Sequence, residues 1–230
     1  LYQQDEGNIV LNGDVVALDS PSDAIALGIG MIHQHFMLVE SLTVAENVAL
    51  GLHSSRGPLT DLERVAVRIS ELAAIYGLQI DPAAYVWQLS VGQQQRVEIM
   101  KALYRGAALL ILDEPTAVLT PQEVDDLFVT LRQMARDGHA LIFISHKLHE
   151  VLDITDRITV MRDGRVVGAM PTERATKQDL ARMMVGREVH LGKQRKEGEL
   201  GAECLAARGL CAMSERGTSA LKGVDLEVRE

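Results

Sequence analysis

The sequence predicts an α/β protein in which helices alternate with the buried strands of a largely parallel sheet. Residues 109–112 and 140–144 are two continuous apolar runs of strand length. Such runs lack the alternation of a half-exposed strand and are typical of parallel strands buried on both faces. Residues 61–76 instead place apolar side chains every three or four positions, which indicates a helix. Strands that alternate with helices define the α/β class.

Helix and turn signals place the other elements along the chain. Asn12-Gly13-Asp14 marks a hairpin turn, Ser90 is a suitable helix N-cap, and Pro121 suits a first helical turn. In chain order, we expect a hairpin of residues 9–17, a helix of 21–27, a short apolar stretch at 30–33, helices of 43–52, 61–76 and 90–103, the first apolar strand, a helix of 122–136, the second apolar strand, a helix of 147–153, a hairpin of 158–169 and a helix of 177–185.

A change of composition divides the chain. Residues 192–201 are charged and nearly free of large apolar side chains, which is typical of a solvated linker. Strand-like stretches follow at residues 204–205 and 224–228 and indicate a new unit. The expected organisation is a first domain over residues 1–189, a linker over 190–201 and the beginning of a second domain over 202–230.

Composition and charge disfavour several classes of protein. The 230 residues carry 23 basic and 32 acidic side chains, a net charge of −9, which argues against binding nucleic acid through its phosphates. No apolar run reaches the roughly eighteen residues of a membrane-spanning helix. Cys204 and Cys211 fit neither a disulfide framework nor paired metal ligands. This cysteine usage suits a reducing compartment.

Polar side chains follow the two apolar runs. Asp113 and Glu114 come directly after the first, and His146 follows the second, 33 residues after Asp113. Adjacent carboxylates at the carboxyl end of a buried parallel strand are suited to hold Mg²⁺ and orient water in phosphoryl transfer. If the two strands are neighbours, His146 lies near these acids. The alternatives are that the acids cap the next segment and that His146 is a structural, hydrogen-bonded residue.

Two further stretches carry candidate residues. Gln34 follows a short apolar stretch, where an amide can reach a metal or a water, although most such glutamines are solvated. Ser90 and Gly92 open a helix, where backbone N–H groups and a hydroxyl favour anions. An ordinary capped helix start explains the same residues. The order and spacing of all four stretches together decide between these interpretations.

The four stretches together resemble the nucleotide-binding domain of ABC transporters. They are Gln34, Leu-Ser-Val-Gly-Gln-Gln-Gln-Arg at 89–96, Leu-Leu-Ile-Leu-Asp-Glu-Pro-Thr at 109–116 and Ile-Ser-His at 144–146. They correspond to that family's Q-loop, signature motif, Walker B strand and switch histidine. The resemblance covers residues 1 to about 189 and extends to the tandem-domain ATP-binding subunits of bacterial importers for simple sugars and nucleosides. Residues 202–230 resemble the opening strands of the second domain.

The resemblance implies a P-loop NTPase-like fold, an α-helical subdomain over about residues 43–105, and ATP and Mg²⁺ as ligands. It implies that Asp113 supports Mg²⁺, that Glu114 polarises the attacking water and that His146 contacts the γ-phosphate. Gln34 would join the nucleotide and metal site to the transmembrane partner.

A second group of residues would serve the other nucleotide of the pair. By the resemblance, the signature residues close on a nucleotide held by the opposing domain: Ser90, Val91, Gly92 and Gln93. Val91 stands where many relatives carry Gly. Thr120 stands where the family usually has Asp, which predicts a weaker contact across the interface between domains.

The phosphate-binding loop of the family has the pattern G-x-x-x-x-G-K-[ST]. None of the six lysines of this sequence is followed by Ser or Thr. The resemblance places one copy of this loop before Leu1 and the next after Glu230, so the expected fold is an ABC domain truncated before its Walker A motif. The chain alone is then expected to bind ATP weakly, because the amides of that loop make most phosphate contacts.

The resulting functional hypothesis is a subunit that hydrolyses ATP to energise import of a simple sugar or nucleoside. Its expected partners are transmembrane permease subunits, a second ABC domain of the same chain and, indirectly, a periplasmic or lipoprotein substrate-binding protein. The expected location is the cytoplasmic face of the inner membrane, and no nucleic acid is expected as partner. The alternatives are a soluble ABC-type ATPase acting on ribosomes or DNA, and an inactive structural or regulatory module.

Overall fold

The computed structural model describes residues 4–52, 61–186, 201–213 and 219–229. The chain divides into two compact units, Leu1–Arg187 and Glu188–Glu230, which are described separately below. In the described part of the chain, no helix is both long and apolar enough to cross a membrane.

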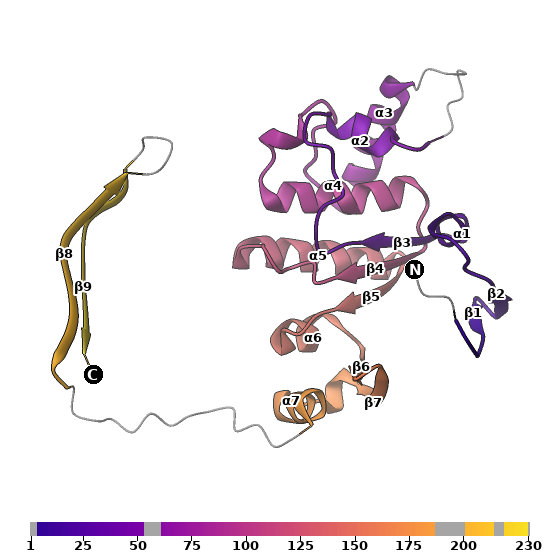
Figure 1. Ribbon diagram of the computed structural model, residues 1–230. Coiled ribbons are helices and arrows are strands. Elements are labelled where there is room, and N and C mark those ends of the chain that lie inside the picture. Colours follow the sequence, from indigo (N-terminus) through magenta and orange to yellow (C-terminus); the bar gives the residue numbers. More distant parts are fainter. Residues whose placement is uncertain (1–3, 53–60, 187–200, 214–218, 230) are drawn as a thin grey trace. The chain divides into compact units, whose positions relative to one another are not determined.

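The first unit is built around a three-stranded parallel sheet. Its strands are β3 (Ile29–Ile32), β4 (Leu109–Asp113) and β5 (Ala140–Ile144), and β4 lies between the other two. Ile32 pairs with Leu112, and Asp113 pairs with Ile144. The three strands therefore end together at one edge of the sheet, as their arrows show in Figure 1. The predicted α/β class with a parallel sheet is confirmed.

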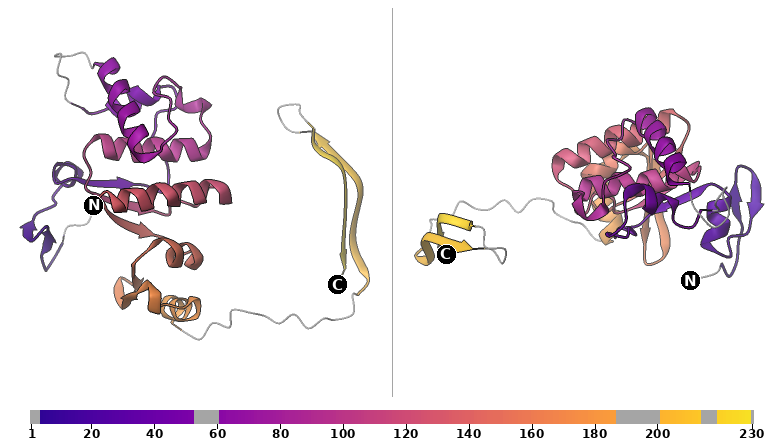
Figure 2. Two further views of the ribbon diagram at one scale, coloured as in Figure 1. Left: turned by 180° about the vertical axis from the view of Figure 1, so that it is seen from behind. Right: turned by 90° about the horizontal axis from the view of Figure 1, so that it is seen from above.

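Helices α4 (Val91–Tyr104) and α5 (Pro121–Arg136) cover one face of this sheet. A Cβ on Gly30 of β3 would lie 3.0 Å from the Cβ of Ala102, so glycine lets α4 approach the strand closely. Helices α2 (Val44–Ala49) and α3 (Leu62–Tyr76) pack on α4 and extend the same apolar core. Figures 1 and 2 show these helices grouped beside the sheet.

The other face of the sheet differs from the expectation of strands buried on both faces. Leu110 and Leu112 are fully buried, but Met31, Ile142 and Ile144 are 45%, 47% and 44% exposed. These three side chains alternate with the ones that α4 and α5 cover, since successive residues of a strand point to opposite faces. The prediction of burial on both faces is therefore wrong for β5, while Leu109 and Ile111 of β4 are partly buried on this face.

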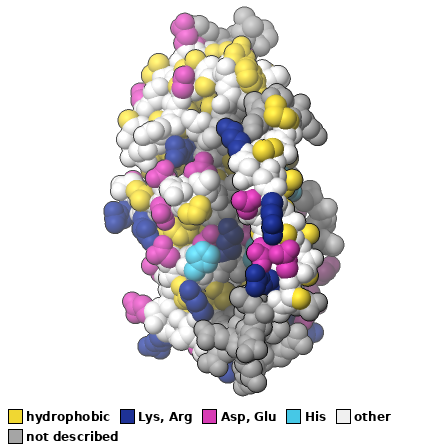
Figure 3. Space-filling model, turned by 90° about the vertical axis from the view of Figure 1, so that its left-hand side faces the viewer, with side chains coloured by type: hydrophobic (Ala, Val, Ile, Leu, Met, Phe, Trp, Pro, Cys, Tyr) yellow, Lys and Arg dark blue, Asp and Glu magenta, His cyan; other side chains and the backbone are white. Residues whose placement is uncertain are grey.

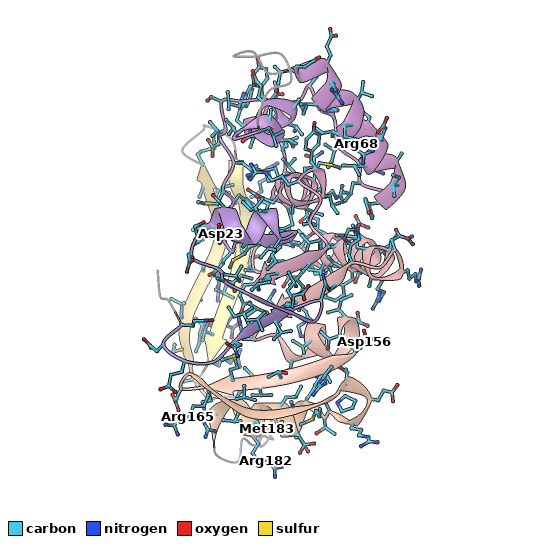
Figure 4. All side chains as sticks on the ribbon, turned by 90° about the vertical axis from the view of Figure 1, so that its right-hand side faces the viewer. Asp23, Arg68, Asp156, Arg165, Arg182 and Met183 are labelled. Atoms are coloured by element: carbon cyan, nitrogen blue, oxygen red, sulfur yellow. The ribbon has the colours of Figure 1, made fainter. Side chains whose placement is uncertain are left out.

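Shorter elements flank the sheet. The hairpin of β1 (Ile9–Leu11) and β2 (Asp14–Val16) precedes helix α1 (Pro21–Ala26). After β5 come α6 (Leu148–Ile154), the hairpin of β6 (Arg157–Arg162) and β7 (Arg165–Pro171), and α7 (Lys177–Val185). A second, smaller apolar cluster joins α6, β6 and α7. Figure 4 shows Met183 and Arg182 of α7 close to β7, the strand that carries Arg165.

Capping interactions explain where the larger helices begin. Ser90, Thr43 and Thr120 each accept a hydrogen bond from the backbone N–H three residues later, and that later side chain binds back to the cap. These are capping boxes, which pair N–H groups that the helix itself leaves open. Asp61 caps α3, and Gly77 ends that helix in the left-handed conformation. The helices predicted over residues 61–76, 90–103, 122–136 and 177–185 are confirmed to within one or two residues.

The second unit contains an antiparallel pair, β8 (Glu203–Met213) and β9 (Ser219–Arg229). Both strands are longer than the sequence indicates, and the described side chains are mostly exposed. The expected linker falls largely on residues 187–200, which lie outside the described residues. The domain boundaries at residues 189 and 202 stay a prediction.

Candidate functional site

The structure brings Glu114 and His146 into direct contact at the carboxyl ends of β4 and β5. One carboxylate oxygen of Glu114, Oε1, lies 2.7 Å from the imidazole Nδ1 of His146 and accepts a hydrogen bond from that residue's backbone N–H at 3.2 Å. The imidazole is 70% exposed, whereas the side chain of Glu114 is 17% exposed. The pair therefore presents one ring nitrogen to the carboxylate and leaves the other, Nε2, for a ligand.

Glu114 holds an unusual backbone conformation. Its φ of +47° lies in the left-handed region, which side-chain-bearing residues seldom adopt. The backbone N–H of Glu114 donates to the carbonyl of Ile144 at 2.9 Å, which ties the residue to the end of β5. The second carboxylate oxygen, Oε2, is buried and has no hydrogen-bond partner in the described structure. Strain and an unpaired acceptor at one carboxylate are features that cluster at functional sites.

A largely buried polar cluster is formed by residues adjacent in sequence to this pair. The carboxylate of Glu150 is 3% exposed, accepts a hydrogen bond from the hydroxyl of Thr116 at 2.5 Å and pairs with the Lys147 ammonium at 3.2 Å. Lys147 also donates to the backbone carbonyl of Thr116 at 2.8 Å. Thr116 is two residues after Glu114, and Lys147 follows His146 directly. The cluster therefore joins the two loops that carry Glu114 and His146.

Asp113 and Gln34 lie at the same edge of the sheet. Asp113 is the last residue of β4 and is partly buried, and Gln34 follows the end of β3 with its side chain exposed. The described residues hold no group of three or more His, Cys, Asp or Glu side chains arranged to bind a metal. Mg²⁺ commonly uses one or two protein oxygens together with substrate phosphates and water, and a carboxylate beside an amide oxygen fits that donor set.

The predicted anion-binding turn is the first turn of α4. The hydroxyl of Ser90 accepts from the backbone N–H of Gln93 at 3.3 Å, and the amide oxygen of Gln93 accepts from the backbone N–H of Ser90 at 2.8 Å. The side chains of Ser90, Val91 and Gln93 are exposed, and Gly92 is buried. This turn thus has the ordinary capping bonds that the structural alternative requires, together with an exposed N-terminus on which an anion can bind.

Glu123 joins this turn to the loop that follows Glu114. Its Oε2 accepts hydrogen bonds at 3.0 Å from both the backbone N–H and the hydroxyl of Thr120. A Cβ on Gly92 would lie 2.4 Å from Glu123 Oε1, so only glycine fits while the carboxylate stays there. The backbone N–H of Thr120 is the main cause that lowers the pKa of Glu123 below its usual range; the Thr120 hydroxyl, the Gly92 N–H and Arg96 also lower it, while burial opposes them.

Thr120 explains how this loop ends without the usual Asp. It is the N-cap of α5, and its hydroxyl accepts from the backbone N–H of Glu123 at 3.4 Å. Threonine and aspartate both serve as N-caps. The replacement therefore keeps the helix start, and the weaker contact between domains stays a prediction.

The eight predicted site residues thus form two groups. Gln34, Asp113, Glu114 and His146 gather where β3, β4 and β5 end, and the four signature residues form the start of α4. In the ranges that the structure describes, no hydrogen bond or ion pair joins the signature residues to Asp113, Glu114 or His146. Figure 3 looks toward the side on which the strands of the first unit end in Figure 1, and a histidine side chain is visible at the surface in this view.

Sequence reasoning missed residues that hold these groups in place. They are Asn47, Glu98, Lys101, Thr116, Glu123, Lys147 and Glu150. A signal was available for two of them: Glu98 stands within an apolar stretch of α4, and Thr116 lies in a stretch that already carries two candidate residues. A charged side chain on a buried helix face needs a partner, and this requirement marks Glu98 for attention.

Comparison with known proteins agrees with these observations. The family model described as "ABC transporter" matches residues 1–117. The chain is 49% identical to the glucose import ATP-binding protein TsgD13 of Haloferax volcanii, over all of this chain and 47% of that protein. It is 43% identical to the nucleoside import ATP-binding protein NupA of Lactococcus lactis subsp. cremoris, over all of this chain and 45% of that protein. The chain spans about half the length of these relatives.

Solved structures show the same fold. The ADP conformation of MJ1267, an ATP-binding cassette of an ABC transporter, is 25% identical with a TM-score of 0.64, over 78% of this chain and 75% of that chain. The dimeric, post-hydrolysis cassette MJ0796 with ADP and Pi is 26% identical with a TM-score of 0.59, over 74% and 75%. The motifs, the parallel sheet and these similarities lead to one conclusion: the chain belongs to the ABC transporter family of ATP-binding proteins.

Proposed function

We propose that this chain is the ATP-hydrolysing part of a subunit that energises import of a simple sugar or nucleoside. The observation that carries the proposal is the contact of Glu114 with His146 at the edge where the parallel strands end. The import ATP-binding proteins to which the chain is 43–49% identical support the transport role. The substrate class follows their names, glucose and nucleoside.

Glu114 is the group that activates water in this proposal. Its carboxylate is partly buried: Oε1 accepts hydrogen bonds from His146, and Oε2 is a buried acceptor with no protein partner among the described residues. The backbone bond to Ile144 and the bond from His146 fix the carboxylate, so little reorganisation is needed at the reaction. A carboxylate that orients or deprotonates the attacking water contributes about 10²–10⁴ in rate.

His146 is the residue that contacts the transferred phosphate. Because a carboxylate is an acceptor only, the hydrogen bond to Glu114 assigns a proton to Nδ1 and directs Nε2 outward. The exposure of the ring makes this nitrogen accessible to a nucleotide. His146 would therefore sense the γ-phosphate and orient Glu114 through one imidazole.

Asp113 and Gln34 are the residues that would hold Mg²⁺. When bound with ATP, this ion neutralises charge on the phosphate oxygens. Asp113 supplies a carboxylate at the strand end and Gln34 an amide from the neighbouring strand's end.

Ser90, Val91, Gly92 and Gln93 would serve a second nucleotide, held by an opposing ABC domain. The exposed start of α4 carries partial positive charge and suits a phosphate. The expected partners are thus a second ABC domain, permease subunits and, through them, a substrate-binding protein. The expected location is the cytoplasmic face of the inner membrane.

Reconstitution tests this function. The complete gene product that contains this sequence is assembled in vesicles with the permease encoded beside it, and the uptake of labelled monosaccharides and nucleosides is measured with and without ATP. ATP-dependent accumulation of one of these compounds is the expected result. Full ATP turnover without accumulation of any of them, or turnover stimulated by ribosomes or DNA instead of the permease, would contradict it.

A further inference from the structure

Both backbone groups of Met37 are held by side chains of the helix that carries the signature turn. The N–H of Met37 donates to Glu98 Oε1 at 2.8 Å, and its carbonyl accepts from Lys101 Nζ at 2.9 Å. Glu98 and Lys101 are one turn apart on α4 and contact each other at 3.4 Å. Met37 lies 61 residues before Glu98, so the contact joins distant parts of the sequence.

These two charged side chains are not an ordinary surface ion pair. The side chains of Glu98 and Lys101 are 8% and 16% exposed. A carboxylate so deeply buried is costly unless it is hydrogen-bonded, and the N–H of Met37 and the Lys101 ammonium provide its partners. Arg68 and Glu71 on α3 form an ion pair with the same sequence spacing, but their side chains are 53% and 54% exposed. Figure 4 labels Arg68 on that helix.

A second side chain holds the same segment two residues later, at Val39. Asn47 of α2 is fully buried, and its amide oxygen accepts from the N–H of Val39 at 2.8 Å. Its amide nitrogen donates to the carbonyl of Val39 at 3.0 Å. Met37 and Val39, in the segment after Gln34, are thus both fixed to helices. Gln34 is three residues before Met37, so the chain between them can extend over at most about 11 Å.

The position of Glu98 on α4 gives this arrangement its functional meaning. Glu98 lies seven residues after Val91, about two helical turns or 10 Å from the signature turn. A helix is a rigid element over this distance, so a shift of its N-terminus moves Met37 as well. We propose that Glu98 and Lys101 are positioning residues that couple Gln34 to the signature turn through α4. This proposal rests on the proposed function, in which the two regions serve different nucleotides.

This coupling between Gln34 and the signature turn depends on one acceptor atom, Glu98 Oε1. Glu98→Met removes the acceptor for the Met37 N–H at nearly constant side-chain length, while Glu98→Gln keeps an amide oxygen there. Glu71→Gln on α3 is the matched control, because it removes the charge of an exposed pair with the same spacing.

Two measurements on the complete gene product test this proposal. Site-resolved hydrogen exchange reports the backbone amide of Met37, which should exchange at least about tenfold faster in Glu98→Met, as expected for a lost hydrogen bond to a buried carboxylate. Glu98→Gln and Glu71→Gln should stay within about threefold of the parent. The second measurement is ATP turnover with and without the permease.

Permease stimulation should fall about five- to tenfold in Glu98→Met, while turnover without permease and the KM for ATP stay within about twofold. Glu98→Gln should restore most of the stimulation. A purely structural role predicts equal losses with and without permease, which would overturn the proposal, as would unchanged Met37 exchange in Glu98→Met. If the parent protein itself shows no permease-stimulated turnover, the proposed function fails, and the Met37 exchange rate still decides whether the link exists.

Discussion

Thr116→Val is the substitution whose effect follows most directly from the structure. Valine has nearly the shape of threonine, so the change removes only the hydroxyl that donates to Glu150 at 2.5 Å. Thr116 is fully buried and Glu150 is 3% exposed, so water cannot replace this donor. A hydrogen bond to a charged group contributes about 1.5–3 kcal/mol, and we expect a loss of about 2 kcal/mol in the free energy of unfolding.

The assay for this loss is urea unfolding of the 230-residue chain followed by far-UV circular dichroism. Trp87, the sole tryptophan of the chain, provides a fluorescence probe of the first unit. With a urea dependence of about 2 kcal/mol per M, the midpoint should fall by about 1 M.

Thr130→Val is the matched control for Thr116→Val. Thr130 is 8% exposed, but its hydroxyl donates to a neutral helix carbonyl, that of Asp126, at 3.2 Å. The expected loss is below about 1 kcal/mol, because a bond to a neutral group contributes less. If Thr116→Val lowers the midpoint no more than Thr130→Val does, the buried Thr116–Glu150 bond has no stabilising role.

Three further predictions follow from contacts elsewhere. Gly92→Ala should displace the Glu123 carboxylate. In a double-mutant cycle, the losses in free energy of unfolding caused by Gly92→Ala and Glu123→Ala should therefore be non-additive by about 1 kcal/mol, and additivity within about 0.4 kcal/mol would contradict the contact. Hydrogen bonds from Thr43 lower the pKa of Glu46, and those from Thr120 lower the pKa of Glu123, below the ordinary value of 4.5. The two ionised carboxylates therefore stabilise the fold above about pH 4.5, and this stabilisation is lost as the pH falls through their folded pKa values. Replacing both glutamates with Gln should flatten the pH dependence of the free energy of unfolding between about pH 5 and 3. Tyr76→Phe removes the hydroxyl that is hydrogen-bonded to His139 at 2.8 Å, and should lower the free energy of unfolding in urea by about 1 kcal/mol. An unchanged urea midpoint would contradict a stabilising role of this bond.

Local signals were sufficient for much of the fold. Ser90, Pro121 and Gly77 mark helix ends through capping and backbone conformation, which depend on nearby residues alone, and the structure has helix boundaries there. The position of His146 near Glu114 was also predictable, because neighbouring parallel strands end at one edge.

Other features depend on parts of the chain that are far apart in sequence. The apolar run of β5 predicts burial on both faces, but Ile142 is 47% exposed because burial depends on which elements cover the strand. Met37, which donates to Glu98, and Thr116, which donates to Glu150, lie 61 and 34 residues away from these carboxylates, and no local pattern identifies them as partners. These contacts explain why the positions of site residues, but not the groups that fix them, were predictable.

The most direct test of the account is ATP turnover of Glu114→Gln in the complete gene product with its permease, with any second nucleotide site inactivated. Glutamine keeps the side-chain length but loses the basic carboxylate beside His146. We expect kcat to fall at least about 100-fold while ATP binding, measured separately, stays within about threefold. Turnover equal to that of the parent protein would contradict the role of Glu114 in hydrolysis and with it the central claim.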